Sequence, residues 1–333
     1  MWKKYKYSII GFISIAFVLS MVNWKVKSMT MLLAERFFPG WAWLEIILVA
    51  FYGAYVIHKM IYSFNTANLR KFTWTVFSIV FFSQLALGLL GKWLDNPTLQ
   101  EFLMTGKLHL PVPALIIGGA VYKFKIGFMP ILFLSTVILS GPSWCSQLCY
   151  FGAMDLQFAS KNKGRPQKVK NKNRLKSTFL ILVVAGALLL RIFDVDITIS
   201  AIAGATFGLV GIGIMYFISR KRKMMFHCTV YCPIGTVIQY LKYINPFRMY
   251  IDTNSCTLCM HCSTTCPYDA LNPENIKAGK PANTCTYCGD CISSCDSSSI
   301  KYKFFNIKGK AAQNIWIVLT ISLHAIFLAL ARI

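Results

Sequence analysis

Charged residues are scarce in this chain, and acidic residues are scarcer still. Only 14% of its 333 residues are charged, with 12 Asp and Glu against 35 Lys and Arg, while 56% are hydrophobic. This composition excludes an ordinary soluble domain. The net charge of +23 would indicate nucleic-acid binding in a soluble protein, but these lysines cluster beside apolar segments, where they act as topology signals. We therefore expect membrane lipids with anionic headgroups as a partner, and no nucleic acid.

Motifs of nucleotide-dependent and hydrolytic enzymes are also missing. The sequence holds no Gly-rich dinucleotide loop, no P-loop and no hydrolytic triad. His58 and His324 lie near or within apolar segments, but no spacing ties them together as haem ligands. Ala203-Gly204-Ala205-Thr206 resembles the tetrapeptide that carries covalent FMN in some membrane redox subunits, but it lacks the usual Ser or Thr at its first position. We expect neither haem nor FMN.

Seven apolar segments are long enough to cross a bilayer. They are residues 8–24, 41–57, 72–91, 126–141, 177–193, 197–218 and 314–331. No small-residue cleavage site follows the first segment, so we expect an uncleaved helix with its N-terminus inside. Lysine and arginine dominate 161–176 and 220–223, and lysines precede the last segment, which predicts a C-terminus outside. The prediction is a multi-pass protein of the cytoplasmic (inner) membrane.

Two features of the apolar regions indicate chemistry. Residues 108–122 are apolar but short and broken by prolines and glycines, so we expect a re-entrant or interfacial hairpin on the outer side. Glu45 lies inside the second segment, where a carboxylate is costly unless it is partnered or protonated. We take Glu45 as the candidate catalytic proton acceptor, with quinone as the substrate.

The last third of the chain carries two identical cysteine spacings. Residues 256–267 read Cys-x2-Cys-x2-Cys-x3-Cys-Pro, and residues 285–295 repeat the four cysteines. Bacterial ferredoxins hold two [4Fe-4S] clusters with this spacing, and the fourth cysteine of each run ligates the other cluster. Thiolates in this number need a reducing compartment or a metal, which indicates the cytosol. The expected ligand sets are Cys256, Cys259, Cys262 and Cys295 for cluster 1, and Cys285, Cys288, Cys291 and Cys266 for cluster 2.

The other four cysteines form a duplicated unit. The pair Cys145 and Cys149 and the pair Cys228 and Cys232 share an aromatic-Cys-x3-Cys-x2-Gly frame, offset by 83 residues. Positions i and i+4 lie on one face of an α-helix, so we expect each unit to present two thiols together. Three interpretations stay open: a third Fe-S or other soft-metal site, a thiol pair that cycles through a disulfide or binds copper, and buried cysteines that only pack.

Paired Cys-x3-Cys-Pro motifs at inner helix ends, followed by two ferredoxin runs, resemble the NapH/NosR-type membrane polyferredoxins, which include the cupric reductase of oxidase assembly. The resemblance covers about residues 72–300. It implies a role between the quinone pool and an acceptor outside the cytoplasmic membrane. The sequence departs from the family pattern where Tyr150 follows Cys149 and Asp296 follows Cys295, since the family has proline at both places.

The combined prediction is an all-α polytopic membrane domain of about seven transmembrane helices with a small α+β dicluster ferredoxin domain on the cytosolic side. Its parts are residues 1–249 (transmembrane domain), 250–305 (ferredoxin) and 306–333 (C-terminal transmembrane helix). The predicted function is electron transfer between the quinone pool or a cytosolic donor and a respiratory or periplasmic reductase, or its maturation system. Other redox subunits would be partners, and the chain would be the redox component of an oxidoreductase system. The alternatives are a copper reductase or assembly factor that uses the Cys-x3-Cys pairs, and a non-catalytic maturation scaffold.

Overall fold

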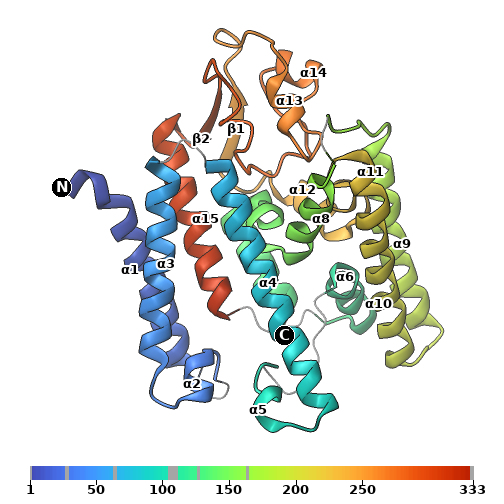
Figure 1. Cartoon of the computed structure of the whole chain (residues 1–333). Helices are drawn as coiled ribbons and strands as arrows, with labels where there is room; N and C mark the ends of the chain where they lie inside the picture. The colour runs from blue at the N-terminus through green and yellow to red at the C-terminus, as the bar shows by residue number, and fades with distance from the viewer. Residues whose placement is uncertain are drawn as a thin grey trace. The chain divides into compact units, whose positions relative to one another are not determined.

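The computed structural model describes residues 2–26, 30–62, 66–103, 112–125, 128–162 and 165–330. Its backbone contacts divide the chain into two compact units (Figure 1). Unit 1 comprises Met1–His109 and Lys310–Ile333, and unit 2 comprises Leu110–Gly309. The C-terminal helix therefore folds with the N-terminal helices, although the whole of unit 2 separates them in the sequence.

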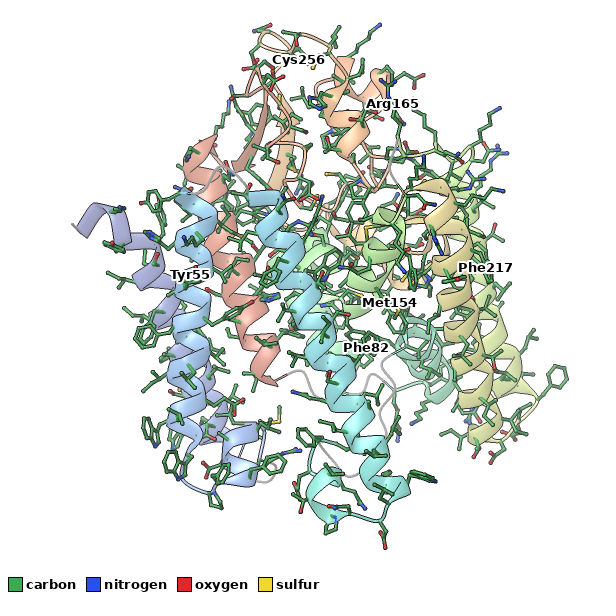
Figure 2. All side chains as sticks on the ribbon, in the orientation of Figure 1. Tyr55, Phe82, Met154, Arg165, Phe217 and Cys256 are labelled. Atoms are coloured by element: carbon green, nitrogen blue, oxygen red, sulfur yellow. The ribbon has the colours of Figure 1, made fainter. Side chains whose placement is uncertain are left out.

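Seven helical segments within the described ranges are long and apolar enough to cross a membrane. They are Lys4–Lys25, Ala42–Tyr62, Thr66–Trp93, Pro130–Leu148, Lys172–Ile192, Ile197–Arg222 and Lys310–Leu330. Each overlaps one of the seven predicted segments, so the prediction of a mostly helical chain is confirmed. Large apolar side chains stand exposed on these helices, including Tyr55 at 60% and Phe217 at 70%, both labelled in Figure 2. Such a surface fits a multi-pass membrane protein.

Unit 1 is a helical bundle. Its elements are α1 (Trp2–Lys25), α2 (Leu33–Phe37), α3 (Ala42–Tyr62), α4 (Thr66–Trp93), α5 (Pro97–Gln100) and α15 (Lys310–Leu330). Helices α1, α3 and α15 pack side by side, and α4 contacts α3 and α15 (Figure 1). Small residues allow this close approach: a Cβ on Gly53 would come within 2.3 Å of the Ile15 side chain. Ala325 of α15 closes the same contact, so the three helices share one core.

Unit 2 joins helices and loops to a small sheet. Its α-helices are α6 (Pro113–Lys123), α7 (Phe128–Ser140), α8 (Tyr150–Ser160), α9 (Lys172–Ile192), α10 (Ile197–Ile214), α11 (Arg220–Arg222), α12 (Pro233–Leu241), α13 (His261–Thr265) and α14 (Pro273–Lys277). A 3-10 turn η1 (Gly141–Ser143) and three π-helical turns, η2 (Trp144–Leu148), η3 (Met215–Ser219) and η4 (His227–Tyr231), interrupt this series. Helix α6 packs against α9 and α10, and α12 packs against α9.

The sheet frames the ferredoxin segment. Strands β1 (Phe247–Ile251), β2 (Ile300–Phe304) and β3 (Ile307–Lys308) form an antiparallel sheet in the order β1-β2-β3. Alternate residues of β1 are buried, as expected for a strand with one face on a core. The pairing of Ile251 with Ile300 brings together the two ends of the intervening loops, which carry all eight ferredoxin cysteines. The predicted small domain with a sheet is confirmed in this form.

The stretch predicted as a hairpin is only partly described. Residues 108–111 lie outside the described residues, and residues 113–123 form helix α6. At 11 residues this helix is about 16 Å long, which is shorter than a bilayer core of about 30 Å. Helix α6 alone therefore cannot span the membrane, and its re-entrant placement stays a prediction.

Candidate functional site

The eight ferredoxin cysteines surround two separate cavities. Cys266, Cys285, Cys288 and Cys291 line one cavity, and Cys256, Cys259, Cys262 and Cys295 line the other. The structure thus brings together the members of each predicted set, including the fourth cysteines that cross between the runs. Ligation itself stays a prediction.

The two cysteine runs also repeat the same backbone path. Leu258 and Tyr287 stand two residues after the first cysteine of each run, and both have left-handed φ angles, of 56° and 54°. Met260 at φ 62° and Gly289 at φ 83° occupy the next equivalent position. A left-handed residue with a side chain costs roughly 1–2 kcal/mol, so such loops need external support. In the second run the Tyr302 hydroxyl supplies it by donating a hydrogen bond of 2.6 Å to the Tyr287 carbonyl.

The two cavities differ in exposure. Cys266 and Cys291 are buried, whereas Cys259 in the other set is exposed. Burial raises the pKa of Cys266 and of Cys285 to about 12. Burial also acts to raise the pKa of Cys295, but hydrogen bonds from Ser297 and from nearby backbone N–H groups outweigh it, and the pKa is lowered.

These residues fit an iron–sulfur cofactor. Four soft thiols around an enclosed space are the donor set that such clusters take. Burial disfavours the charged thiolate form of Cys266 and Cys285, and the positive charge of an iron–sulfur core would stabilise these thiolates. The backbone N–H of Ala270 lies 3.5 Å from the Cys266 sulfur and can donate to it.

The duplicated cysteine frame folds into two equivalent turns. In each unit a five-residue π-helical turn, η2 or η4, contains the first cysteine, and the next residue is the second cysteine. The N–H of Cys149 donates to the Trp144 carbonyl over 3.0 Å, and the N–H of Cys232 donates to the His227 carbonyl over 2.8 Å. The expectation that each pair shares one face of an α-helix is wrong, because the second cysteine has an extended backbone and is the N-cap of the following helix. Irregular turns of this kind occur frequently at functional sites.

Each second cysteine sits at the start of a helix, with N–H donors around its sulfur. Cys149 precedes α8, and the N–H groups of Phe151 and Gly152 act to lower its pKa against a larger effect of burial, which raises it to about 12. Cys232 precedes α12 in the same way, and the Gly235 N–H donates to its sulfur over 3.4 Å. Tyr150 begins α8 where Pro233 begins α12, so the departure from the family pattern leaves the helix start unchanged.

The structure brings all four of these cysteines together. Burial raises the pKa of Cys228 well above its ordinary value, and Asp155 and the other three thiols, those of Cys149, Cys232 and Cys145, raise it further. The four thiols therefore lie within electrostatic range of one another. Among the described residues, no three His, Cys, Asp or Glu side chains converge closely enough for one metal ion, so the four are neighbours without meeting at a point.

Two charged residues at this site were not predicted. Asp155 of α8 is fully buried and accepts a hydrogen bond of 3.0 Å from the Cys228 N–H. Burial raises the pKa of Asp155 to about 6. Lys176 of α9 is also buried, donates to Gln239 over 2.8 Å, and lies within electrostatic range of Cys145, Cys228 and Cys232. For Asp155 the sequence carried one signal, an acidic residue within an otherwise apolar stretch. Lys176 gave no such signal, because it is one of many basic residues in 161–176.

Contacts join the turn η2 and the segment that leads into η4 to the ferredoxin loops. Ser146, between Cys145 and Cys149, donates to the Thr286 carbonyl over 3.4 Å. The N–H of Met225, just before η4, donates to the Pro267 carbonyl over 2.9 Å. Further links are the ion pair of Lys172 with Asp269 at 3.0 Å and the bond of Lys242 to the Asn283 carbonyl at 2.7 Å.

Glu45 and the two candidate histidines belong to unit 1. Glu45 stands in the first turn of α3 and accepts a hydrogen bond of 2.7 Å from the Ala34 N–H. The carboxylate is therefore near the end of its helix, and its role as a proton acceptor stays a prediction. His324 is buried and lies 3.1 Å from the Tyr52 hydroxyl, while the ring of His58 stacks on Tyr5.

Comparison with known proteins identifies one segment. Residues 248–296 match the family described as the 4Fe-4S dicluster domain. The match covers the segment between the start of β1 and the last ferredoxin cysteine, and it supports iron–sulfur clusters and electron transfer. No curated protein and no solved structure matches the chain significantly.

Proposed function

We propose that this chain is a membrane-bound iron–sulfur electron-transfer protein of the NapH/NosR type. It would pass electrons between the quinone pool or a cytosolic donor and a respiratory or periplasmic reductase, or the maturation system of that reductase. The observation that carries the proposal is the sorting of eight cysteines into two cavities, each lined by one crossed set of four. The dicluster match over residues 248–296 supports the same conclusion.

Cys256, Cys259, Cys262 and Cys295 would hold cluster 1, and Cys266, Cys285, Cys288 and Cys291 would hold cluster 2. A bound [4Fe-4S] cluster supplies reversible one-electron transfer at a potential set by charge, hydrogen bonds to sulfur and solvent exposure. The chain sets these conditions differently at the two sites. Lys242 lies within electrostatic range of Cys285 at the buried site, where its positive charge favours the reduced, more negative state. The exposed Cys259 opens the other site to a soluble partner.

The membrane part of the proposal rests on the seven apolar helices and the basic segments. Within unit 2, α9 begins inside the basic stretch 165–176, and Arg220–Arg222 ends the span Ile197–Arg222. Basic residues at helix ends favour the cytosolic side. Lys172, in the first of these segments, pairs with Asp269 of the ferredoxin loops, which would therefore lie on that side too.

Low-temperature EPR of the anaerobically purified full chain tests the proposal. Dithionite reduction should give the signal of two interacting [4Fe-4S] clusters. A Cys285→Ser variant should lose cluster 2 and a Cys256→Ser variant cluster 1, so the spectral splitting that arises from the interaction of clusters 1 and 2 should vanish in each variant. Iron–sulfur signals that persist unchanged in both variants, or no cluster signal in the unmodified chain, would contradict it.

A second arm of the same experiment tests the quinone link. Reduction of the clusters by a menaquinol analogue supports quinol as the donor, and a Glu45→Gln variant should then slow this reduction and leave the dithionite reaction unchanged. Reduction by dithionite alone would leave a cytosolic donor as the source of electrons.

A further inference from the structure

We propose that Cys145, Cys149, Cys228 and Cys232 ligate a third iron–sulfur cluster, which exchanges single electrons with cluster 2. The inference rests on the proposed function, since it uses cluster 2 as the redox partner. In the transfer one cluster loses one electron as the other gains it, and no bond forms or breaks. The ultimate donor is the same reductant that serves the ferredoxin clusters.

The first support is the duplicated geometry. Two copies of one turn, η2 with α8 and η4 with α12, each contribute one cysteine inside a π-helical turn and one at a helix N-cap. A bare packing role would not require the sulfur of Cys232 to accept the Gly235 N–H, or Cys149 to have N–H donors at the equivalent positions. Backbone N–H groups and a helix N-terminus stabilise a thiolate, which is the form that ligates metal.

The second support is charge. Four thiolates at this buried site would carry four negative charges, and Asp155 would add to them when ionised. Lys176 lies within electrostatic range of three of the thiols. The Lys176 ammonium group alone cannot balance this charge, and unpaired buried charges are very costly. A cationic metal core would provide the compensation, and four soft sulfur ligands select thiophilic metals.

The third support is position along the electron path. Thr286, whose carbonyl accepts from Ser146 of η2, is the residue after Cys285, and Pro267, whose carbonyl accepts from Met225, is the residue after Cys266. The turn η2 and the segment that leads into η4 thus contact the backbone next to ligands of cluster 2. In Figure 2, Cys256 of cluster 1 lies well away from Met154 on α8 within the same unit. The order of centres is therefore cluster 1, cluster 2, third cluster.

This position favours iron–sulfur chemistry over zinc. Zn²⁺ has no redox chemistry, so a zinc site beside cluster 2 would end the electron path there. Iron–sulfur clusters take four thiolates and tune their potential through N–H donors to sulfur, and this site offers both.

Iron and acid-labile sulfide analysis of the full chain, purified anaerobically in detergent, tests the inference. Two [4Fe-4S] clusters account for about eight iron and eight sulfide atoms per chain, so the unmodified protein should contain more than this. A Cys149→Ser/Cys232→Ser variant should lose the excess and keep the ferredoxin EPR signal. The matched control, Cys256→Ser, should lose the iron of cluster 1, about four atoms per chain, and keep the iron that the Cys149→Ser/Cys232→Ser variant loses.

The outcomes separate this inference from the proposed function. A normal dicluster signal with no iron above eight would overturn the third cluster alone, as would zinc or copper at the four thiols or a disulfide between them. The absence of the dicluster signal would instead overturn the proposed function. If the serine variant fails to fold, Lys176→Gln replaces it. Loss of the positive charge should move the reduction potential of the third cluster to more negative values and leave the iron content unchanged. The exposed Lys170→Gln is its control, and equal potentials in both variants would overturn the placement of the centre beside Lys176.

Discussion

The Tyr302 hydroxyl should control how firmly cluster 2 is held. It donates a hydrogen bond of 2.6 Å to the Tyr287 carbonyl, and both residues are buried. Tyr287 lies between Cys285 and Cys288 with a left-handed backbone, so this bond supports a strained part of the cluster 2 loop. Tyr302→Phe removes the donor and keeps the ring, which costs about 1–3 kcal/mol for a buried acceptor that loses its partner.

This cost acts on local opening of the loop. A weakening of about 1–3 kcal/mol raises the open population by about 5- to 150-fold. When opening limits the attack of an iron chelator, iron loss from cluster 2 should accelerate by the same factor, and cluster 1 should keep its normal rate. The assay follows bleaching of the iron–sulfur absorbance in the full chain under anaerobic chelation, where the unmodified protein and the variant are compared phase by phase.

Tyr250→Phe is the matched control. It removes the same atom from β1, the strand that pairs with β2, and so leaves the Tyr302 bond in place. The control should bleach at the rate of the unmodified chain. Equal bleaching rates in Tyr302→Phe and the control, or faster loss of cluster 1 in Tyr302→Phe, would refute the idea that this hydroxyl holds the loop.

Three further perturbations test other parts of the structure. Gly289 has a φ angle of 83°, and a Cβ there would lie 3.0 Å from a tyrosine hydroxyl. Gly289→Ala should therefore cost at least about 1–2 kcal/mol and speed iron loss from cluster 2. Its control is Gly309→Ala, which is also left-handed but lies in open space, and it should leave iron retention unchanged. A Cβ on Gly235 would lie 2.9 Å from a backbone carbonyl of η4. Gly235→Ala should therefore destabilise the four-thiol site by about 1–3 kcal/mol and increase maleimide labelling of its cysteines. The control Gly213→Ala, where a Cβ would have no atom within 4 Å, should leave the labelling unchanged. Iron removal should make the fold sensitive to alkali: the Cys266 pKa is raised from 9.0 to about 12, so its stabilising effect is complete below pH 9 and is lost as the pH rises to about 12. Near-UV circular dichroism would show this loss in the stripped protein, and a loaded protein with equal sensitivity would contradict it.

Short-range patterns were predictable from the sequence. The spacing of the ferredoxin cysteines depends on how one loop wraps a cluster, so it identified the two sets of four that line the cavities. Apolar length alone identified all seven candidate spans. The shared frame of the two Cys-x3-Cys units indicated a duplication, and the turns η2 and η4 with their following helices have that form.

Other features of the site depend on contacts between distant residues. The pair spacing in Cys-x3-Cys suggested an α-helical face, but the chain forms a π-helical turn and starts a new helix at the second cysteine. Asp155 could not be placed beside Cys228 from sequence, because 73 residues separate them. The same holds for Ser146 and Thr286, which are 140 residues apart.

The sequence by itself determined that this chain has seven apolar segments, a dicluster cysteine pattern and a second, duplicated set of four cysteines. Each of these features depends on the spacing of residues close together in the sequence, so it can be recognised without knowledge of the fold. Only the tertiary structure decided that the four remaining thiols gather at one buried site with Asp155 and Lys176, and that this site contacts the backbone next to Cys266 and Cys285. The physical reason is that packing of α8, α9 and α12 in unit 2 brings these side chains together, and such packing depends on the whole unit.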